Sequence, residues 1–330
     1  MKQWLIVGVD VSKKTLDIFI RPSDLGFKIE NSPSGFQQLH QRLSSLGCGS
    51  QAVMIVMEHT GMYSRLFEKF LHENKLPFSK VPALQIKRSI GMVRGKQDSI
   101  DAYRIAEYGW LRKDTLKATE PLNPLIEQLN RLLQLRVKLV GDRAGYLCSA
   151  KEAKSAGFTL KADPAGKILK QTIDLLSRQI TATEKQIQKL IESNESIKKN
   201  CQLLMSIVGV GLIISASTMA VSANFTRFAS ARKFNCYSGL APFKHQSGTS
   251  IKGRTRVSHL ANKGIKTLLN MAASAAIQHD QELKNYYQRR VAEGKSKMSC
   301  LNIVRGKIVS RMFAVIKRQT PFVKLQTIPE

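Results

Sequence analysis

Two carboxylates three residues apart, Asp98 and Asp101, lie between the cations Lys96 and Arg104. If a helix begins near Asp98, this spacing puts both side chains on one face, where they could share a cation. An acidic first turn is also an ordinary start of a helix, with Asp98 as the N-cap and no metal. The positions of the other acids therefore bear on whether this pair is a cap or part of a site.

Two of those acids, Asp10 and Glu58, each lie at the end of an apolar run that is typical of a buried strand. The pattern predicts strands over 5–11, 15–20, 27–30, 52–57 and 78–81, and helices over 34–46, 63–73 and 83–90. Three antiparallel strands followed by alternating strands and helices is the order of a ribonuclease H-like sheet. Because the first and fourth strands of such a sheet are neighbours, we expect Asp10 and Glu58 to converge.

The helix that begins near Asp98 would bring two more carboxylates to the same place. Four acids repel one another unless cations neutralise them, and ligand sets made of oxygen select hard ions such as Mg²⁺ or Mn²⁺. Two such ions about 4 Å apart stabilise the attacking and leaving oxygens of in-line attack at a phosphodiester. Each acid also has a structural explanation: a strand-end turn for Asp10, a turn before Gly61 for Glu58, and a helix cap for the pair. One metal site explains all four together.

The chain is strongly basic, with a net charge of +28, which exceeds what solubility needs and predicts nucleic acid as the partner. The surplus is greatest in residues 201–330, which carry 20 Lys and Arg against 4 Asp and Glu. No acid lies between Glu195 and Asp280. Since a solvated face normally mixes both signs, this stretch is suited to phosphates.

The 5 cysteines are scattered and form no CxxC pair, which argues against a disulfide framework or a zinc site and for a reducing compartment. The first residues lack the pattern of a signal peptide, so we expect a cytoplasmic protein. The uncharged run over 203–221 is long enough for a membrane span. It is rich in Ser and Gly and lies in a basic region, so we expect no membrane partner.

Changes in charge and in the spacing of apolar residues along the chain predict three domains and a fold class of α/β plus all-α. We expect a ribonuclease H-like catalytic domain over 1–120, a helical hairpin or coiled-coil assembly region over 121–200, and a mainly helical basic domain over 201–330. In the middle region, apolar residues at helical spacing lie on both sides of the break at 163–166. Their stripe is either a core or the seam of a homo-oligomer, a dimer or a tetramer.

The last domain contains a Gly-x-Gly turn, Gly209 and Gly211, before an expected helix, and such a turn can point free backbone N–H groups at a phosphate. The cations that we expect to contact phosphates are Lys244, Lys252, Arg254, Arg256 and Lys263. Ser247 lies among these cations and next to Gly248. A serine can attack phosphorus where cations neutralise the phosphate. It can equally bind a phosphate or shape a turn, and no general base lies at a recognisable spacing.

Together these residues resemble the DEDD-type transposases of bacterial insertion sequences, the IS110 family with its IS1111 branch. The resemblance covers nearly the whole chain. The stretches similar to the acidic motifs, which carry Asp10, Glu58, Asp98 and Asp101, are 8–13, 57–63 and 96–102. In the basic domain the similar stretches are 206–211, where Val208 replaces the usual proline, and 237–242 followed by 246–248.

The resemblance implies a RuvC-like catalytic domain in a recombinase that joins element ends to target DNA. It implies that Ser247 is the nucleophile of a serine–phosphate link, and that the acidic site of one subunit completes the serine site of another. It also implies two partners, double-stranded DNA and a structured non-coding guide RNA from the element. Two alternatives stay open: a metal-dependent Holliday-junction-type nuclease in which Ser247 has no chemical role, and a non-catalytic nucleic-acid-binding protein.

Overall fold

The computed structural model describes residues 4–46, 53–59, 61–89, 98–121, 123–158, 163–247 and 251–323. For some residues in regular elements, among them Asp98, Lys244, Ser247, Lys252 and Arg254, this description covers the backbone alone. The chain forms two compact units, Met1–Pro121 and Leu122–Glu330. Each unit has its own hydrophobic core.

The N-terminal unit contains a five-stranded mixed sheet in the order β3-β2-β1-β4-β5. Its strands are β1 (Leu5–Val11), β2 (Thr15–Arg21), β3 (Leu25–Glu30), β4 (Val53–Glu58) and β5 (Phe78–Val81). β2 is antiparallel to β1 and β3, whereas β1, β4 and β5 are parallel. The predicted mixed sheet is confirmed, and β1 and β4 are neighbours, as expected of a ribonuclease H-like order.

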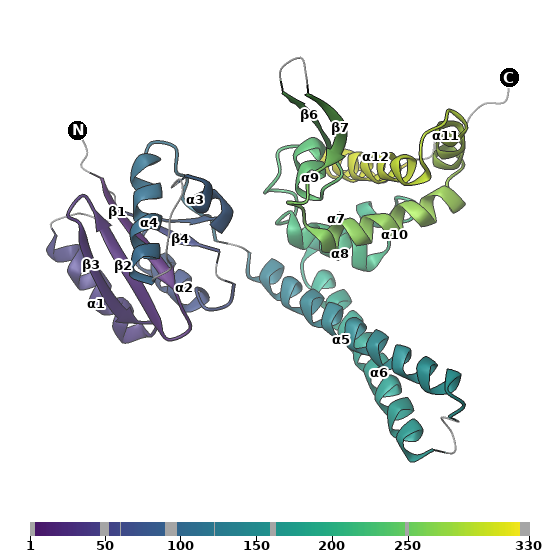
Figure 1. Ribbon diagram of the computed structural model, residues 1–330, viewed down its shortest axis with the longest axis horizontal. Helices are drawn as coiled ribbons and strands as arrows, with labels where there is room; N and C mark the ends of the chain where they lie inside the picture. The colour runs from purple at the N-terminus through teal and green to yellow at the C-terminus, as the bar shows by residue number, and fades with distance from the viewer. Residues whose placement is uncertain are drawn as a thin grey trace. The chain divides into compact units, whose positions relative to one another are not determined.

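Helices cover both faces of this sheet (Figure 1). They are α1 (Pro33–Ser45), α2 (Arg65–Glu73), α3 (Ala83–Ser89) and α4 (Asp98–Leu111). On one face, apolar residues of α1 and α2 form a core with the odd-numbered residues of β1, such as Val7. On the other face, Ile105 of α4 packs in a second core with Ile6. The alternation of β1 therefore directs its even-numbered residues, Asp10 among them, toward α4.

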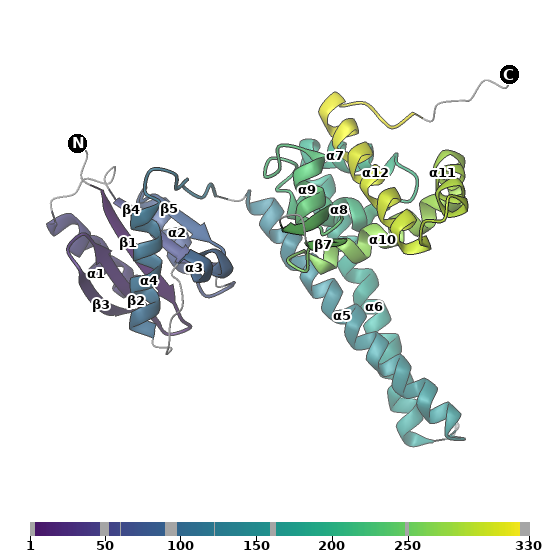
Figure 2. The ribbon, with the colours of Figure 1, turned by 45° about the horizontal axis from the view of Figure 1, so that its top comes forward.

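The C-terminal unit is mainly helical, as the sequence predicts. Its helices are α5 (Pro124–Ser155), α6 (Pro164–Glu192), α7 (Glu195–Met205), α8 (Leu212–Val221), α9 (Ala231–Tyr237), α10 (Lys263–His279), α11 (Gln281–Ala292) and α12 (Lys297–Arg318). α5 and α6 lie side by side as a long hairpin (Figure 2). At its base, Leu129 and Ile187 are buried in one core with Leu204 of α7 and Val304 of α12. The base of the hairpin is thus built into the core of the other helices.

A two-stranded hairpin, β6 (Pro242–Ser247) and β7 (Ile251–Val257), interrupts the helices. This stretch is rich in turn-forming residues, with Pro242 and several glycines. The strands nevertheless pair in antiparallel register, with Ser247 opposite Ile251. Ser247 therefore ends a strand.

Among the described helices, none is both long enough and apolar enough to span a membrane. α8 contains most of the apolar run that the sequence offers as a span, and its buried residues Ala216 and Met219 belong to the core. Four cysteines in the described part of the chain are free: Cys148, Cys201, Cys236 and Cys300.

Candidate active site

The register of β1 and β4 brings Asp10 and Glu58 to the same end of neighbouring parallel strands. Val9 and Met57 are partners in this pair, and Asp10 and Glu58 are the next residue of each strand. Residues in register on parallel strands point to the same face, so both carboxylates lie on the face that α4 covers. This is the convergence that the sequence predicts.

Two glycines allow α4 to approach this part of the sheet closely. A Cβ on Gly8 would lie 2.3 Å from the backbone N of Ala106 and 2.4 Å from the carbonyl O of Ala102. A Cβ on Gly109 would lie 2.7 Å from a methyl group of Ile6. All three distances are below those that real Cβ atoms adopt, so larger residues would push the helix away. Because Asp101 precedes Ala102, the contact at Gly8 also determines how near Asp101 comes to the strands.

The carboxylate of Glu58 interacts with two other acids of the predicted quartet. Burial raises the pKa of Glu58 above its ordinary value, and the charges of Asp10 and Asp101 raise this pKa further. The structure therefore brings Asp10 and Asp101 each near Glu58. The backbone of Asp98 begins α4 one turn before Asp101, and its carboxylate lies outside the described part.

Asp101 has a cation of its own in the described structure. Its Oδ1 accepts a hydrogen bond from Nη1 of Arg104 at 2.7 Å. The two side chains are largely buried, with exposed fractions of 26% and 15%. Arg104 thus offsets part of the negative charge that gathers at Glu58.

The chemical type of the ligand atoms at this site suits a divalent cation. Its atoms are carboxylate oxygens, the ligands that Mg²⁺ and Mn²⁺ prefer, and a cation would relieve the repulsion that raises the pKa of Glu58. Among the described side chains, however, no group of three or more His, Cys, Asp or Glu is spaced closely enough to hold a metal. Any coordination shell therefore has to include groups beyond these, such as Asp98, water or a substrate phosphate.

A further acid, Asp17, lies beside the predicted quartet and is absent from the residues that the sequence patterns single out. Asp17 of β2 is directly opposite Asp10 of β1, and it is buried, with an exposed fraction of 7%. Its Oδ1 lies 3.2 Å from Nζ of Lys28, its partner on β3. A signal for it exists in the sequence, because a hairpin that turns at 12–15 places residues 10 and 17 face to face.

In the C-terminal unit, the structure places Ser247 at the end of β6, and the side chain of Ser247 lies outside the described part, as does Gly248. Three of the expected phosphate contacts, Lys244, Lys252 and Arg254, are on the same hairpin with their side chains undescribed. The hairpin thus carries the predicted serine and three predicted cations on two paired strands.

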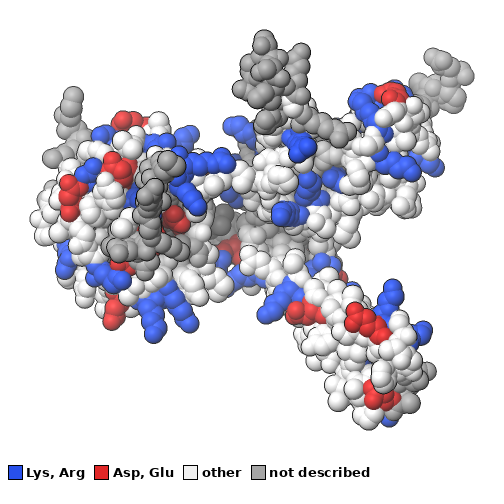
Figure 3. Space-filling view, viewed as in Figure 1, with Lys and Arg blue, Asp and Glu red and all other residues white. Residues whose placement is uncertain are grey.

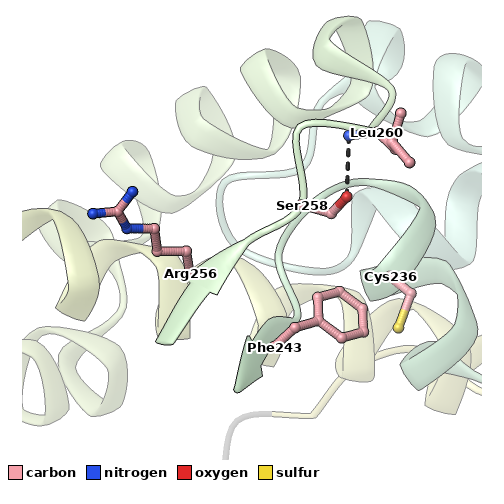
Figure 4. A pocket seen from close by; sticks show the side chains of 5 residues that line it. All are labelled: Cys236, Phe243, Arg256, Ser258 and Leu260. Carbon is pink, nitrogen blue, oxygen red and sulfur yellow. Dashed lines mark hydrogen bonds between the residues drawn. The ribbon is translucent and has the colours of Figure 1, made fainter. Parts of the chain in front are cut away.

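The side chains of the other two predicted cations, Arg256 and Lys263, are described and exposed. Arg256 of β7 is the cross-strand partner of Phe243, and both line a shallow pocket with Cys236, Ser258 and Leu260. In this pocket, the Phe243 ring points toward Cys236, whereas the guanidinium of Arg256 extends away from both (Figure 4). Arg256 can therefore reach a ligand outside the pocket. Lys263 is the first residue of α10.

The two glycines of the Gly-x-Gly turn have different surroundings. Gly209 adopts a φ of +88°, and a Cβ there would lie 2.4 Å from the carbonyl O of Ala272 on α10. The positive φ and the close contact with α10 account for a glycine at position 209. No bound phosphate is needed to explain it. Gly211 is the N-cap of α8, which has no side-chain cap, and a Cβ at Gly211 would meet open space. Between these glycines, Gly211 is the one placed to approach a ligand.

Family models and known proteins match this chain over most of its length. A family model of the DEDD type of IS110, described as "Transposase", matches residues 7–152, and a model described as "Transposase IS116/IS110/IS902 family" matches residues 201–288. The pilin gene-inverting protein of Moraxella lacunata is 26% identical over 96% of this chain and 97% of its own. The transposase for insertion sequence element IS1111A of Coxiella burnetii is 22% identical over 98% of this chain and 92% of its own.

Among solved structures, a Thermus RuvC in complex with a Holliday junction substrate matches 36% of this chain and 100% of its own, with 14% identity and a TM-score of 0.26. The two family models match residues in both units, namely the mixed sheet with its acids and the basic helical unit. These features define a transposase of the DEDD type. The chain belongs to the IS116/IS110/IS902 family of insertion-sequence transposases.

Proposed function

We propose that this protein is a DNA recombinase that cleaves and exchanges strands through a metal-dependent acidic site and a covalent phosphoserine. The observation that carries the proposal is that Asp10 and Asp101 lie near Glu58 on one face of the sheet, where their charges raise its pKa, in a chain with a net charge of +28. Relatives of similar length are named for transposition and for gene inversion, and both processes rearrange DNA.

In this proposal Asp10, Glu58, Asp98 and Asp101 hold Mg²⁺ or Mn²⁺. When bound, the metal would polarise the phosphodiester and stabilise the charge of its attacking and leaving oxygens. The carboxylates supply oxygen ligands from two strands and one helix. Gly8 keeps that helix at the strands, and Arg104 holds Asp101 in one orientation.

Ser247 is proposed as the nucleophile. Its Oγ forms a bond to phosphorus, the bond between phosphorus and the leaving sugar oxygen breaks, and the serine proton passes to solvent or to a base on the substrate. The phosphoserine ester conserves the energy of the broken bond for the later joining step. Lys244, Lys252 and Arg254 would neutralise the phosphate during attack, and Arg256, Lys263 and the backbone of Gly211 would hold flanking phosphates.

The proposed partners are the ends of the element and its target as double-stranded DNA, together with a non-coding guide RNA. We also propose three functional parts: a RuvC-like catalytic domain over 1–120, an assembly region over 121–200 that joins copies into a dimer or tetramer, and a nucleic-acid-binding domain over 201–330. Assembly would allow the acids of one subunit to act with the serine of another.

The second candidate is a metal-dependent junction nuclease. It is favoured by one specific observation, namely that the described side chains which converge are acids. Acids and a metal suffice for hydrolysis by water, and Ser247 would then have no chemical role.

The proposal is tested by neutralising each acid without changing its size: Asp10→Asn, Glu58→Gln, Asp98→Asn and Asp101→Asn. Each change should abolish Mg²⁺-dependent strand cleavage while DNA binding persists, because the basic C-terminal unit is intact. Asp142→Asn, an exposed acid of α5, is the matched control and should cleave normally. Full activity of Asp101→Asn would remove that residue from the site, and full activity of all four variants would refute the proposal.

A further inference from the structure

A cluster of cations lies on α11, on α12 and on the turn between them. Its members are Arg289, Arg290, Lys295, Lys297 and Lys307, which we call the α11–α12 cation cluster. None of them is among the phosphate contacts that the sequence predicts, and the family model that covers this unit ends at residue 288. Figure 3 shows Lys and Arg side chains over this part of the unit, with a small acidic patch among them.

The ring of Tyr286 gathers three of these cations. Nζ of Lys307 lies 4.3 Å from the ring centroid, and the guanidinium carbons of Arg289 and Arg290 lie 5.5 Å and 5.9 Å from it. These distances are within the range of cation–π attraction. Tyr286 therefore joins cations of two helices into one local concentration of positive charge.

The acids nearby do not balance this charge. From Lys284 to Lys307 the chain contains one acid, Glu293. Glu293 pairs with Arg290 at 2.5 Å and with Arg289 at 3.8 Å. Glu282, just before this stretch, pairs with Arg311 at 2.7 Å. Because like charges held together repel, a cluster of this kind is suited to an anionic partner.

The surroundings favour the backbone of a duplex over unpaired bases. Proteins that bind single strands stack bases on exposed aromatic rings. The ring of Tyr286 is contacted by cations, so its role is to hold them in place. Arg289, Lys295 and Lys297 are exposed on helices or at their ends, where they can reach phosphates without reading bases.

We infer that the α11–α12 cation cluster binds the phosphate backbone of double-stranded DNA outside the hairpin that carries Ser247, and that Tyr286 organises it. This inference rests on the proposed function for the choice of DNA. The cluster adds a second duplex contact, independent of base sequence, to the contacts of β6 and β7. Such a contact would position a DNA arm without taking part in chemistry.

The test uses the full-length protein with Arg289, Lys295 and Lys297 changed to Gln, and a short DNA duplex of random sequence. The plot of log affinity against log salt should become shallower by about 2.7, because each phosphate that a cation neutralises adds about 0.9 to the slope. The matched control changes three exposed cations of the α5–α6 hairpin, Lys151, Lys154 and Lys167, to Gln and should keep the wild-type slope.

Tyr286 supplies a second test that a general loss of charge cannot mimic. Tyr286→Phe keeps the ring and should keep the affinity, whereas Tyr286→Leu should lower it several-fold at unchanged net charge. Equal slopes for the cluster variant and the wild type would overturn the inference. A cluster variant that binds the DNA duplex normally and loses affinity only for an RNA duplex of the same sequence would also overturn it. If the proposed function fails and the inference holds, the wild-type protein will bind DNA through this cluster and will not cleave it.

Discussion

Asp10 and Asp17 lie directly opposite each other on the antiparallel strands β1 and β2, so two carboxylates share the face of the sheet that α4 covers. Like charges in such a cross-strand pair destabilise a sheet. Lys28, on the far side of Asp17, neutralises part of this charge at 3.2 Å. The arrangement makes Asp17 a neighbour of the candidate site that adds to its negative field.

We predict that Asp17→Asn weakens the binding of Mg²⁺ or Mn²⁺ by about three- to tenfold, since the charge of a buried neighbouring carboxylate is only partly screened. Titration calorimetry of the metal in the absence of DNA measures this effect. Lys28→Ala is a control with the opposite change in charge. It removes the positive charge beside Asp17, so metal binding should stay equal or become tighter. Unchanged affinity in Asp17→Asn would show that its charge does not reach the metal.

A second prediction concerns stability without metal. The pKa of Glu58 is raised in the folded protein, mainly by burial and then by Asp10 and Asp101. The stabilising contribution of a group with a raised folded pKa is present below its unfolded pKa and is lost as pH rises through the folded pKa. As pH rises, this contribution is lost, so burial and the charges of Asp10 and Asp101 at Glu58 make the metal-free fold less stable.

Glu58→Gln should accordingly raise the thermal midpoint of the chelator-treated protein at neutral pH. Adding Mg²⁺ should raise the midpoint of the wild type and raise that of the variant less. Calorimetric scans with and without metal measure both effects. A lower midpoint for metal-free Glu58→Gln would contradict the assignment of Glu58 to a repulsive cluster.

A third prediction concerns the contact between β1 and α4. Gly8→Ala should destabilise the N-terminal unit by about 1–3 kcal/mol, the usual cost of overpacking, because the new Cβ would overlap the backbone of Ala102 and Ala106. Strand cleavage should fall with it, since Asp101 moves with α4. Gly145→Ala in α5 is the matched control: its Cβ meets open space, and alanine favours a helix by roughly 0.5–1 kcal/mol. Urea denaturation compares the two variants.

Much of the N-terminal unit follows from the sequence, because its elements have strong local patterns. The strand ending near Asp10, the strand ending at Glu58 and the helix beginning at Asp98 all form as predicted. The helix predicted over 34–46 forms as α1 with Phe36, Leu39 and Leu43 buried, whereas Leu46 is 40% exposed because the helix ends at Ser45.

The features that local patterns do not predict depend on contacts between distant residues. Gly209 matches a phosphate-binding turn locally, yet its close neighbour is Ala272, on a helix far along the chain. The β6–β7 hairpin has a composition typical of turns. Its strands form nevertheless, because strand formation depends on cross-strand contacts more than on composition. Asp17 belongs to no motif, and only its pairing with Asp10 across the turn at 12–15 points to it.

A fourth prediction concerns acid sensitivity. Asp280 caps α11 and accepts a hydrogen bond from Arg311 at 2.6 Å. Burial alone would raise the pKa of Asp280, but the bonds from Arg311 and from the backbone of Leu283 and Glu282 lower it overall. The stability from a lowered pKa is present above the unfolded pKa and is lost as pH falls through the folded pKa.

Asp280→Asn keeps a good N-cap and removes the charge. We expect it to cost about 2 kcal/mol at neutral pH, as for a hydrogen bond between charged groups. The loss of stability on acidification should also become less steep. Glu293→Gln, which changes a more exposed acid of the same region, should leave the acid response near that of the wild type. Parallel acid responses of Asp280→Asn and the wild type would contradict the role of this pair.

We expect strand cleavage to use both the acidic site and Ser247. The most direct measurement is a denaturing gel of the full-length protein incubated with Mg²⁺, its DNA and guide RNA, which separates covalent protein–DNA adducts from free DNA ends. The wild type should form the adduct, Ser247→Ala and Asp101→Asn should bind DNA and form none, and Ser250→Ala should behave as the wild type. An adduct that persists in Ser247→Ala, or free ends that accumulate without any adduct in the wild type, would contradict the account.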